Sequence, residues 1–179
     1  VKTRVQSLER GHCRNLNSKL VFGSGVHDML RVEKTQDFLK QKQLWYGILD
    51  RCFSEKFLET SPPYKNCKVS ESWLRLSNFI EDVKSIENFE KSLNEGWQLD
   101  KDILGDGTIY SEDVCVFVPQ ELNSFFKKKD GLTMIDCIHS VFESEIRTNK
   151  LMSIIDQHKD NLDQRVLKMF DFERSDETV

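Results

Sequence analysis

Two carboxylates and one amide near the middle of the chain are the side chains best suited to chemistry. Asp100 and Asp102 stand two residues apart, so a strand there would project both from one face, about 6 to 7 Å apart. Asn123 lies about one turn into a predicted helix, at the edge of its apolar side. Carboxylate and amide oxygens suit Mg²⁺ or Mn²⁺ better than zinc, and such an ion can assist phosphodiester hydrolysis. The competing interpretation is that the aspartates form the solvent face of a strand and Asn123 is a surface residue.

A β-hairpin followed by a helix must position these three side chains. Residues 97–104 alternate between apolar and polar side chains over their first half, which is typical of a half-buried strand. Residues 105–107 read Gly-Asp-Gly, a strong turn signal, and the β-rich run 114–118 follows on its far side. The proline that ends this run also suits the first position of a helix, predicted over residues 119–129.

Helices are predicted on both sides of this unit. Apolar side chains recur at helical spacing in residues 35–53, from residue 70 to about 83, in residues 132–142 and in residues 150–170. Two consecutive prolines in residues 61–64 require a loop. We therefore expect an α+β fold, mostly helical, built as a single domain around a small β-hairpin and helix.

The length and composition predict one globular core with three regions. The 179 residues, 38% hydrophobic and 31% charged, suffice for one domain. We expect an N-terminal arm over residues 1–30, a core over 31–130 and a C-terminal helical segment over 131–179. No run of eighteen apolar residues occurs and the mean hydropathy is −0.53, so we expect a soluble, intracellular protein that does not engage membranes.

The overall charge disfavours a protein that binds nucleic acid over its whole surface. Twenty-six basic and thirty acidic residues leave a net charge of −4, so any such contact must be a local patch. The run Lys127, Lys128 and Lys129 is the candidate for nucleic-acid binding. Its alternative interpretation is an ordinary solvated face.

The cysteines leave two interpretations open. The chain has five, at positions 13, 52, 67, 115 and 137, without a C-x-x-C pair, and they are most simply reduced and buried. A zinc site assembled from Cys52, Cys67, Cys115 and a histidine also fits the residue types.

The resemblance to a known family rests on several short sequence segments that occur in the same order along this chain. They are residues 45–52, residues 64–69 with Trp73 and Phe79, residues 96–104, and residues 110–112 with residues 115–119 and Asn123. Together they resemble a large group of bacteriophage and prophage proteins described as HNH-type or homing-endonuclease-like. The resemblance covers roughly residues 23–126, and residues 150–170 look like the helix that commonly closes such proteins.

The resemblance implies a ββα-metal nuclease-like core, a DNA substrate and phage origin, with the host bacterial cytoplasm as the location. It places Asp100 as the first metal ligand and Asn123 as the last. Lys101 stands where the group has a histidine that acts as general base. A lysine is neutral near pH 7 only when strongly desolvated, so we expect Lys101 to neutralise a phosphate or a neighbouring aspartate. His27 is the histidine from outside the unit that we would test as a base.

A second departure concerns DNA recognition. Proteins of this group often carry a small three-stranded DNA-reading domain, of the kind seen in plant ethylene-response factors, between the nuclease-like unit and the closing helix. In this chain only residues 130–149 occupy that interval, so the resemblance does not imply DNA reading by such a domain.

Two hypotheses about function follow. The first is a phage endonuclease dependent on Mg²⁺ or Mn²⁺, in which Asp102 supports the ion and Lys101 or His27 assists at the phosphate. The second is an inactive phage accessory protein that uses the same fold to bind a host or phage complex, such as a polymerase, a nuclease or a defence system.

Overall fold

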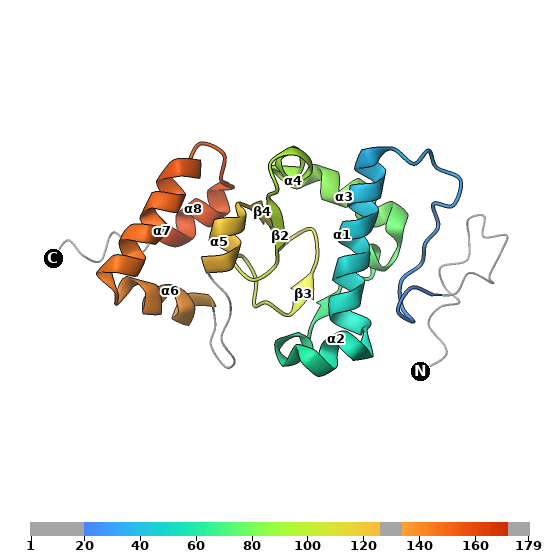
Figure 1. Cartoon of the computed structure of the whole chain (residues 1–179), viewed down its shortest axis with the longest axis horizontal. Helices are drawn as coiled ribbons and strands as arrows, with labels where there is room; N and C mark the ends of the chain where they lie inside the picture. The colour runs from blue at the N-terminus through green and yellow to red at the C-terminus, as the bar shows by residue number, and fades with distance from the viewer. Residues whose placement is uncertain (1–19, 126–133, 172–179) are drawn as a thin grey trace.

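The computed structural model describes residues 20–125 and 134–171 (Figure 1). Most of the predicted N-terminal arm and the basic run Lys127, Lys128 and Lys129 lie outside these residues. The described part is α+β and mostly helical, as predicted. None of its helices is both long enough and apolar enough to cross a membrane.

Eight α-helices, two 3-10 turns and four short strands make up the described residues. The helices are α1 (Gln36–Phe53), α2 (Glu55–Thr60), α3 (Leu76–Ser85), α4 (Phe89–Asn94), α5 (Gln120–Phe125), α6 (Met134–Phe142), α7 (Glu145–His158) and α8 (Gln164–Asp171). The 3-10 turns are η2 (Pro62–Tyr64) and η3 (Ser72–Leu74). The strands are β1 (Lys68–Val69), β2 (Gln98–Asp100), β3 (Ile109–Tyr110) and β4 (Val116–Val118).

The strands form two small sheets rather than one hairpin with a tight turn. β2 pairs with β4 in antiparallel register, with Leu99 opposite Phe117 and Asp100 opposite Val116. β1 pairs with β3 in parallel, so β3 interrupts the connection between β2 and β4. The predicted pairing of the two runs is therefore confirmed. However, β2 is shorter than the predicted strand, and the connection between β2 and β4 is longer than the predicted turn. α5 begins directly after β4 and packs against β2, which completes a strand, strand and helix unit.

Local capping explains where several helices begin. Thr35 accepts a hydrogen bond from the Phe38 backbone N–H at 3.2 Å and caps α1, as predicted. The helix expected over residues 150–170 is instead two helices, α7 and α8. Asp163 accepts a hydrogen bond from the Arg165 backbone N–H at 2.8 Å and starts α8 there. Figure 1 shows α6, α7 and α8 grouped at one end, with α5 between them and the strands.

The core joins α1 both to η3 and to the segment that precedes α1. The Trp45 indole N–H donates to the Trp73 carbonyl oxygen at 2.6 Å, and both tryptophans are fully buried. Gly25 lies against α1 so closely that a Cβ atom there would come within 2.3 Å of a Leu49 methyl group. The last residues of the predicted arm therefore dock on α1 rather than extending into solvent, and α1 is held between this segment and the strands (Figure 1).

Candidate active site

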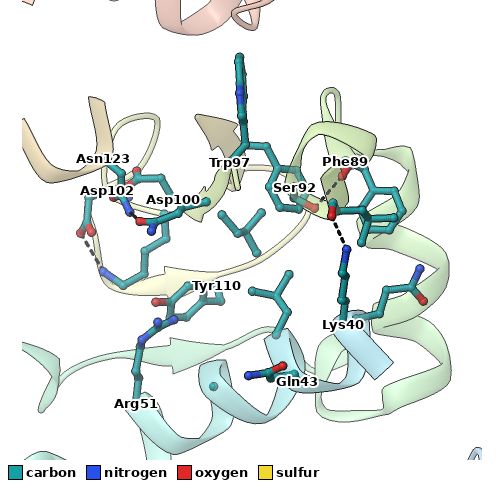
Figure 2. A pocket seen from close by; sticks show the side chains of 18 of the residues that line it. Lys40, Gln43, Arg51, Phe89, Ser92, Trp97, Asp100, Asp102, Tyr110 and Asn123 are labelled. Atoms are coloured by element: carbon teal, nitrogen blue, oxygen red, sulfur yellow. Dashed lines mark hydrogen bonds and ion pairs between the residues drawn. The ribbon is translucent and has the colours of Figure 1, made fainter. Parts of the chain in front are cut away.

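A cavity of about 510 Å³ is lined by residues of α1, of α4 and of the β2, β4 and α5 unit. All three predicted metal ligands, Asp100, Asp102 and Asn123, line it, and Lys101 lines it with them. Figure 2 shows the two aspartates and Asn123 on one side of this cavity and Arg51, which comes from α1, on the other. The fold therefore brings together the residues that the sequence singled out, although they come from different elements.

Asp100 ends β2 and is buried. Only 6% of the residue is exposed, which contradicts the interpretation that it belongs to the solvent face of a strand. Its Oδ1 accepts hydrogen bonds from the backbone N–H groups of Asp102 at 2.8 Å and Ile103 at 2.7 Å. Its Oδ2 has no hydrogen-bond partner among residues 20–125 and 134–171. Burial raises the pKa of Asp100 to about 6, and the nearby Asp102 charge adds to this, although the two backbone hydrogen bonds oppose it.

The alternating pattern predicted that Asp100 and Asp102 project from the same strand face. This prediction is wrong for Asp102. The strand ends at Asp100 because the Asp100 carboxylate accepts the next backbone N–H groups and turns the chain. Asp102 is positioned instead by Lys101, whose Nζ lies 2.7 Å from its Oδ1. Its carboxylate thus has a cation partner, whereas Asp100 forms no ion pair within the described ranges.

Lys101 is a buried ammonium rather than a proton acceptor. It is 5% exposed, and its Nζ also donates to the Gly107 carbonyl oxygen at 2.8 Å. The rings of Tyr64 and Tyr110 lie 5.3 and 5.5 Å from the same nitrogen. Burial by itself lowers the pKa of Lys101, but the charge and hydrogen bond of Asp102 raise it, and the net change is upward. Lys101 therefore neutralises a neighbouring aspartate, as expected, and holds the loop after β2.

Asn123 reaches the neighbouring strand from the first turn of α5. Its side-chain amide donates a hydrogen bond to the Gln98 Oε1, at the start of β2. Because Gln98 and Asp100 belong to the same three-residue strand, this contact sets the position of α5 relative to Asp100. The prediction that Asn123 lies at the edge of the buried side of its helix and faces a strand is confirmed.

His27 is not brought to this cavity. It belongs to the segment that docks beside α3, where its neighbour Asp28 pairs with Arg75 at 3.2 Å and accepts the Ser77 backbone N–H at 3.0 Å. His27 is absent from the cavity lining, and so are the other histidines of the described residues. The proposed catalytic base from outside the unit therefore has no support in the fold.

The sequence analysis missed a cationic wall opposite the aspartates. Arg51, in the last turn of α1, lines the cavity together with Tyr110, and although burial lowers the pKa of Arg51, the proximity of Tyr110 raises it. Lys40, three turns earlier, also lines it and donates to the Leu93 carbonyl oxygen of α4. Arg51 belongs to residues 45–52, one of the sequence segments on which the resemblance rests. Only packing shows that its helix faces β2.

The donor set at Asp100 fits a hard divalent cation. Among the described residues, no three His, Cys, Asp or Glu side chains converge on a common point, which also removes support for zinc on Cys52, Cys67 and Cys115. Mg²⁺, however, is commonly held by one or two carboxylates together with water and substrate phosphate. Asp100 supplies an unpaired oxygen on a buried carboxylate, and Asp102 and Asn123 line the same cavity. The residues present therefore fit Mg²⁺ or Mn²⁺ better than zinc.

Comparison of this chain with protein-family models, with curated proteins and with solved structures finds no match.

Proposed function

We propose that this protein is a metal-dependent DNA endonuclease of the phage HNH-like type, acting in the cytoplasm of a bacterial host. The observation that carries the proposal is Asp100, a buried carboxylate that lines a cavity together with Asn123 and has no ion-pair partner in the part of the chain that the structure describes. Polar groups that lack compensation in a cavity are typical of functional sites.

Each side chain has a separate task in this proposal. Asp100 and Asn123 hold Mg²⁺ or Mn²⁺, and Asp102 supports the ion while Lys101 fixes the Asp102 carboxylate. When bound, such an ion supplies positive charge that stabilises the negative charge developing on a phosphodiester and its leaving oxygen. Arg51 binds a phosphate oxygen from the opposite wall, because its guanidinium carries several donors in a fixed plane.

A second candidate function is an accessory protein that keeps this fold as a scaffold and binds a host or phage complex. Three observations favour it. The cavity lining contains no histidine from the described residues to accept a proton, and the Asp102 carboxylate is already paired with Lys101. The net charge of −4 also gives no general attraction to DNA.

Plasmid nicking with Mg²⁺ or Mn²⁺ tests the endonuclease. We expect nicking that requires the metal and falls at least about 100-fold in Asp100→Ala and in Asn123→Ala, because each loses a metal ligand. Asp156→Asn, which removes an exposed carboxylate from α7, serves as the charge-matched control and should nick like the wild type.

Thermal unfolding with added Mn²⁺ separates the two candidates. An ion bound only by the folded state raises the melting temperature by mass action. A rise in wild type but not in Asp100→Ala, without cleavage of DNA or RNA, would identify a metal-binding scaffold. Intact nucleic acid and an unchanged melting temperature with both metals would remove the endonuclease proposal.

A further inference from the structure

Two cysteines that take no part in the proposed mechanism meet beside the end of α1, next to Arg51. Cys52 lies in the last turn of α1 and Cys67 directly precedes β1, fifteen positions later in the chain. Their sulfur atoms are 3.1 Å apart, and the Cys52 thiol donates to the Cys67 sulfur. Both side chains are buried and both cysteines are free. The sulfurs need to approach by only about 1 Å to reach the length of a disulfide bond.

We propose that Cys52 and Cys67 form a reversible oxidation site, which a peroxide converts to an intramolecular disulfide. This inference goes beyond the proposed nuclease activity and does not depend on it. It rests on the contact between the two sulfurs and on the elements that carry them.

The reaction balances with hydrogen peroxide as the oxidant. The Cys67 thiolate attacks one peroxide oxygen, which forms an S–O bond, breaks the O–O bond and leaves a sulfenic acid and hydroxide. The Cys52 sulfur then attacks the Cys67 sulfur, forms the S–S bond and displaces the oxygen, which leaves as water with the Cys52 proton. The two sulfurs together lose two electrons and the peroxide gains them. A dithiol such as dithiothreitol returns both electrons and restores the thiols.

The surroundings of Cys67 favour its thiolate. The hydrogen bond from Cys52 lowers the pKa of Cys67, and the charge of Lys101 adds to this, while burial and the charge of Asp102 oppose it. The net direction is downward. The same contact and burial raise the pKa of Cys52, so Cys67 is the sulfur that attacks the peroxide, and Cys52 keeps its proton until the second step.

The disulfide would join two elements that support the cavity. Cys52 follows Arg51 in α1, and β1 pairs with β3, which carries Tyr110, a residue that lines the cavity together with Arg51. Oxidation therefore ties the end of α1 to the sheet beside which Arg51 rests. It also closes the loop of residues 52–67, which restricts the unfolded chain and should raise stability.

The remaining described cysteines supply controls. Cys115 and Cys137 are buried, but within the described ranges neither has another sulfur within hydrogen-bond distance. Proximity thus distinguishes Cys52 and Cys67 from two cysteines of similar burial. Cys137→Ser is the preferred control, because Cys115 adjoins β4 in the candidate site.

Peptide mapping of the wild-type protein tests the pair without any substitution. After peroxide treatment and alkylation of the remaining thiols, trypsin releases residues 52–56 and 66–68 as separate peptides. We expect these two joined, lighter by two hydrogen atoms than their sum, and separated again by dithiothreitol. Peroxide that leaves both cysteines free for alkylation, or that oxidises either one without joining the two peptides, would overturn the proposal.

Melting temperature gives an independent readout. Oxidised wild type and oxidised Cys137→Ser should each melt about 5 °C above their reduced forms. Cys52→Ser and Cys67→Ser, if folded when reduced, should show no such rise. A rise that persists in Cys67→Ser would assign the effect to other cysteines and contradict the pair. Neither this measurement nor the mapping uses DNA cleavage, so failure of the nuclease proposal leaves them unaffected.

Discussion

The cavity and the C-terminal helices each bury one aspartate, and the two regions balance its charge differently. Asp163, before α8, is 4% exposed and Asp100, at the end of β2, is 6% exposed. Asp163 accepts the Arg165 backbone N–H and also the Arg165 guanidinium, with Nη2 at 2.7 Å. From the described residues, Asp100 accepts two backbone N–H groups and no side-chain donor.

The two pKa values move in opposite directions, because Asp163 has Arg165 as a partner and because Asp100 lies deeper in the protein. Burial by itself raises the pKa of Asp163, but the Arg165 hydrogen bonds and charge lower it, and the net change is downward. The pKa of Asp100 rises to about 6 because burial outweighs its hydrogen bonds. The two environments therefore yield one carboxylate that stabilises the fold and one that weakens it. Such a cost is typical of residues kept for binding or catalysis.

The Asp163 and Arg165 pair has a clear structural role. The Arg165 Nη1 also donates to the Asp113 carbonyl oxygen at 2.9 Å, in the loop before β4. The pair thus starts α8 and ties the C-terminal helices to the strands. The corresponding cation near Asp100, Lys101, is directed to Asp102 instead.

Replacing Lys101 should give the largest change in stability. Lys101→Met keeps a long side chain but leaves Asp102 without its ion pair, and we expect a loss of about 3 kcal/mol in urea unfolding. The Asp100 pKa should rise further, because Lys101 now lowers it. The double variant Lys101→Met with Asp102→Asn should recover part of the loss. No recovery would show that the pairing with Asp102 is not what Lys101 contributes.

Asp100→Asn should stabilise the protein at pH 8. The pKa change from 3.8 to about 6 corresponds to a cost of about 3 kcal/mol for the ionised group. Asparagine keeps the oxygen that accepts the two backbone N–H groups, so we expect a gain of about 2 kcal/mol in urea unfolding, with loss of any Mn²⁺ response. Asp156→Asn is the matched control and should change little. A variant less stable than wild type at pH 8 would contradict the difference drawn between the two aspartates.

The gain in stability expected for Asp100→Asn depends on pH, and the raised pKa of Asp100 fixes the direction of this dependence. Because the folded pKa is raised, the folded state holds its proton longer than the unfolded state between pH 3.8 and about 6. Stability of the wild type therefore falls as pH rises through this window and stays lowered above it. The difference between wild type and Asp100→Asn should shrink steadily as the pH of the urea titration is reduced from 8 to 4.

Asp163→Asn should show a smaller effect of the opposite sign. Asparagine can still accept the Arg165 backbone N–H, but it loses the charge that holds the guanidinium. We expect a loss of about 1 to 2 kcal/mol at pH 7, limited because the Arg165 side chain is 50% exposed. Since the pKa of Asp163 is lowered, its contribution exists above pH 3.8 and is lost as pH falls below it. Equal stability of variant and wild type at pH 7 would contradict a stabilising pair.

Much of the unit that carries the candidate site could be predicted from local sequence. The alternating and β-rich runs indicated the strands that pair, the proline after the second run marked the following helix, and Thr35 was recognised as a cap. The direction of Asp102 could not be predicted. It depends on the Asp100 side chain capturing the next two backbone N–H groups, which ends the alternation at once.

The sequence by itself determined the mostly helical α+β class, the pairing of β2 with β4 and the residues of the acidic side of the cavity. Periodicity, turn residues and caps act over a few positions, so they can be recognised along the chain. Only the tertiary structure decided that Arg51 faces Asp100, that His27 lies elsewhere and that Cys52 meets Cys67. These contacts depend on how separate helices and strands pack, and burial and charge pairing between distant segments leave no local pattern to recognise.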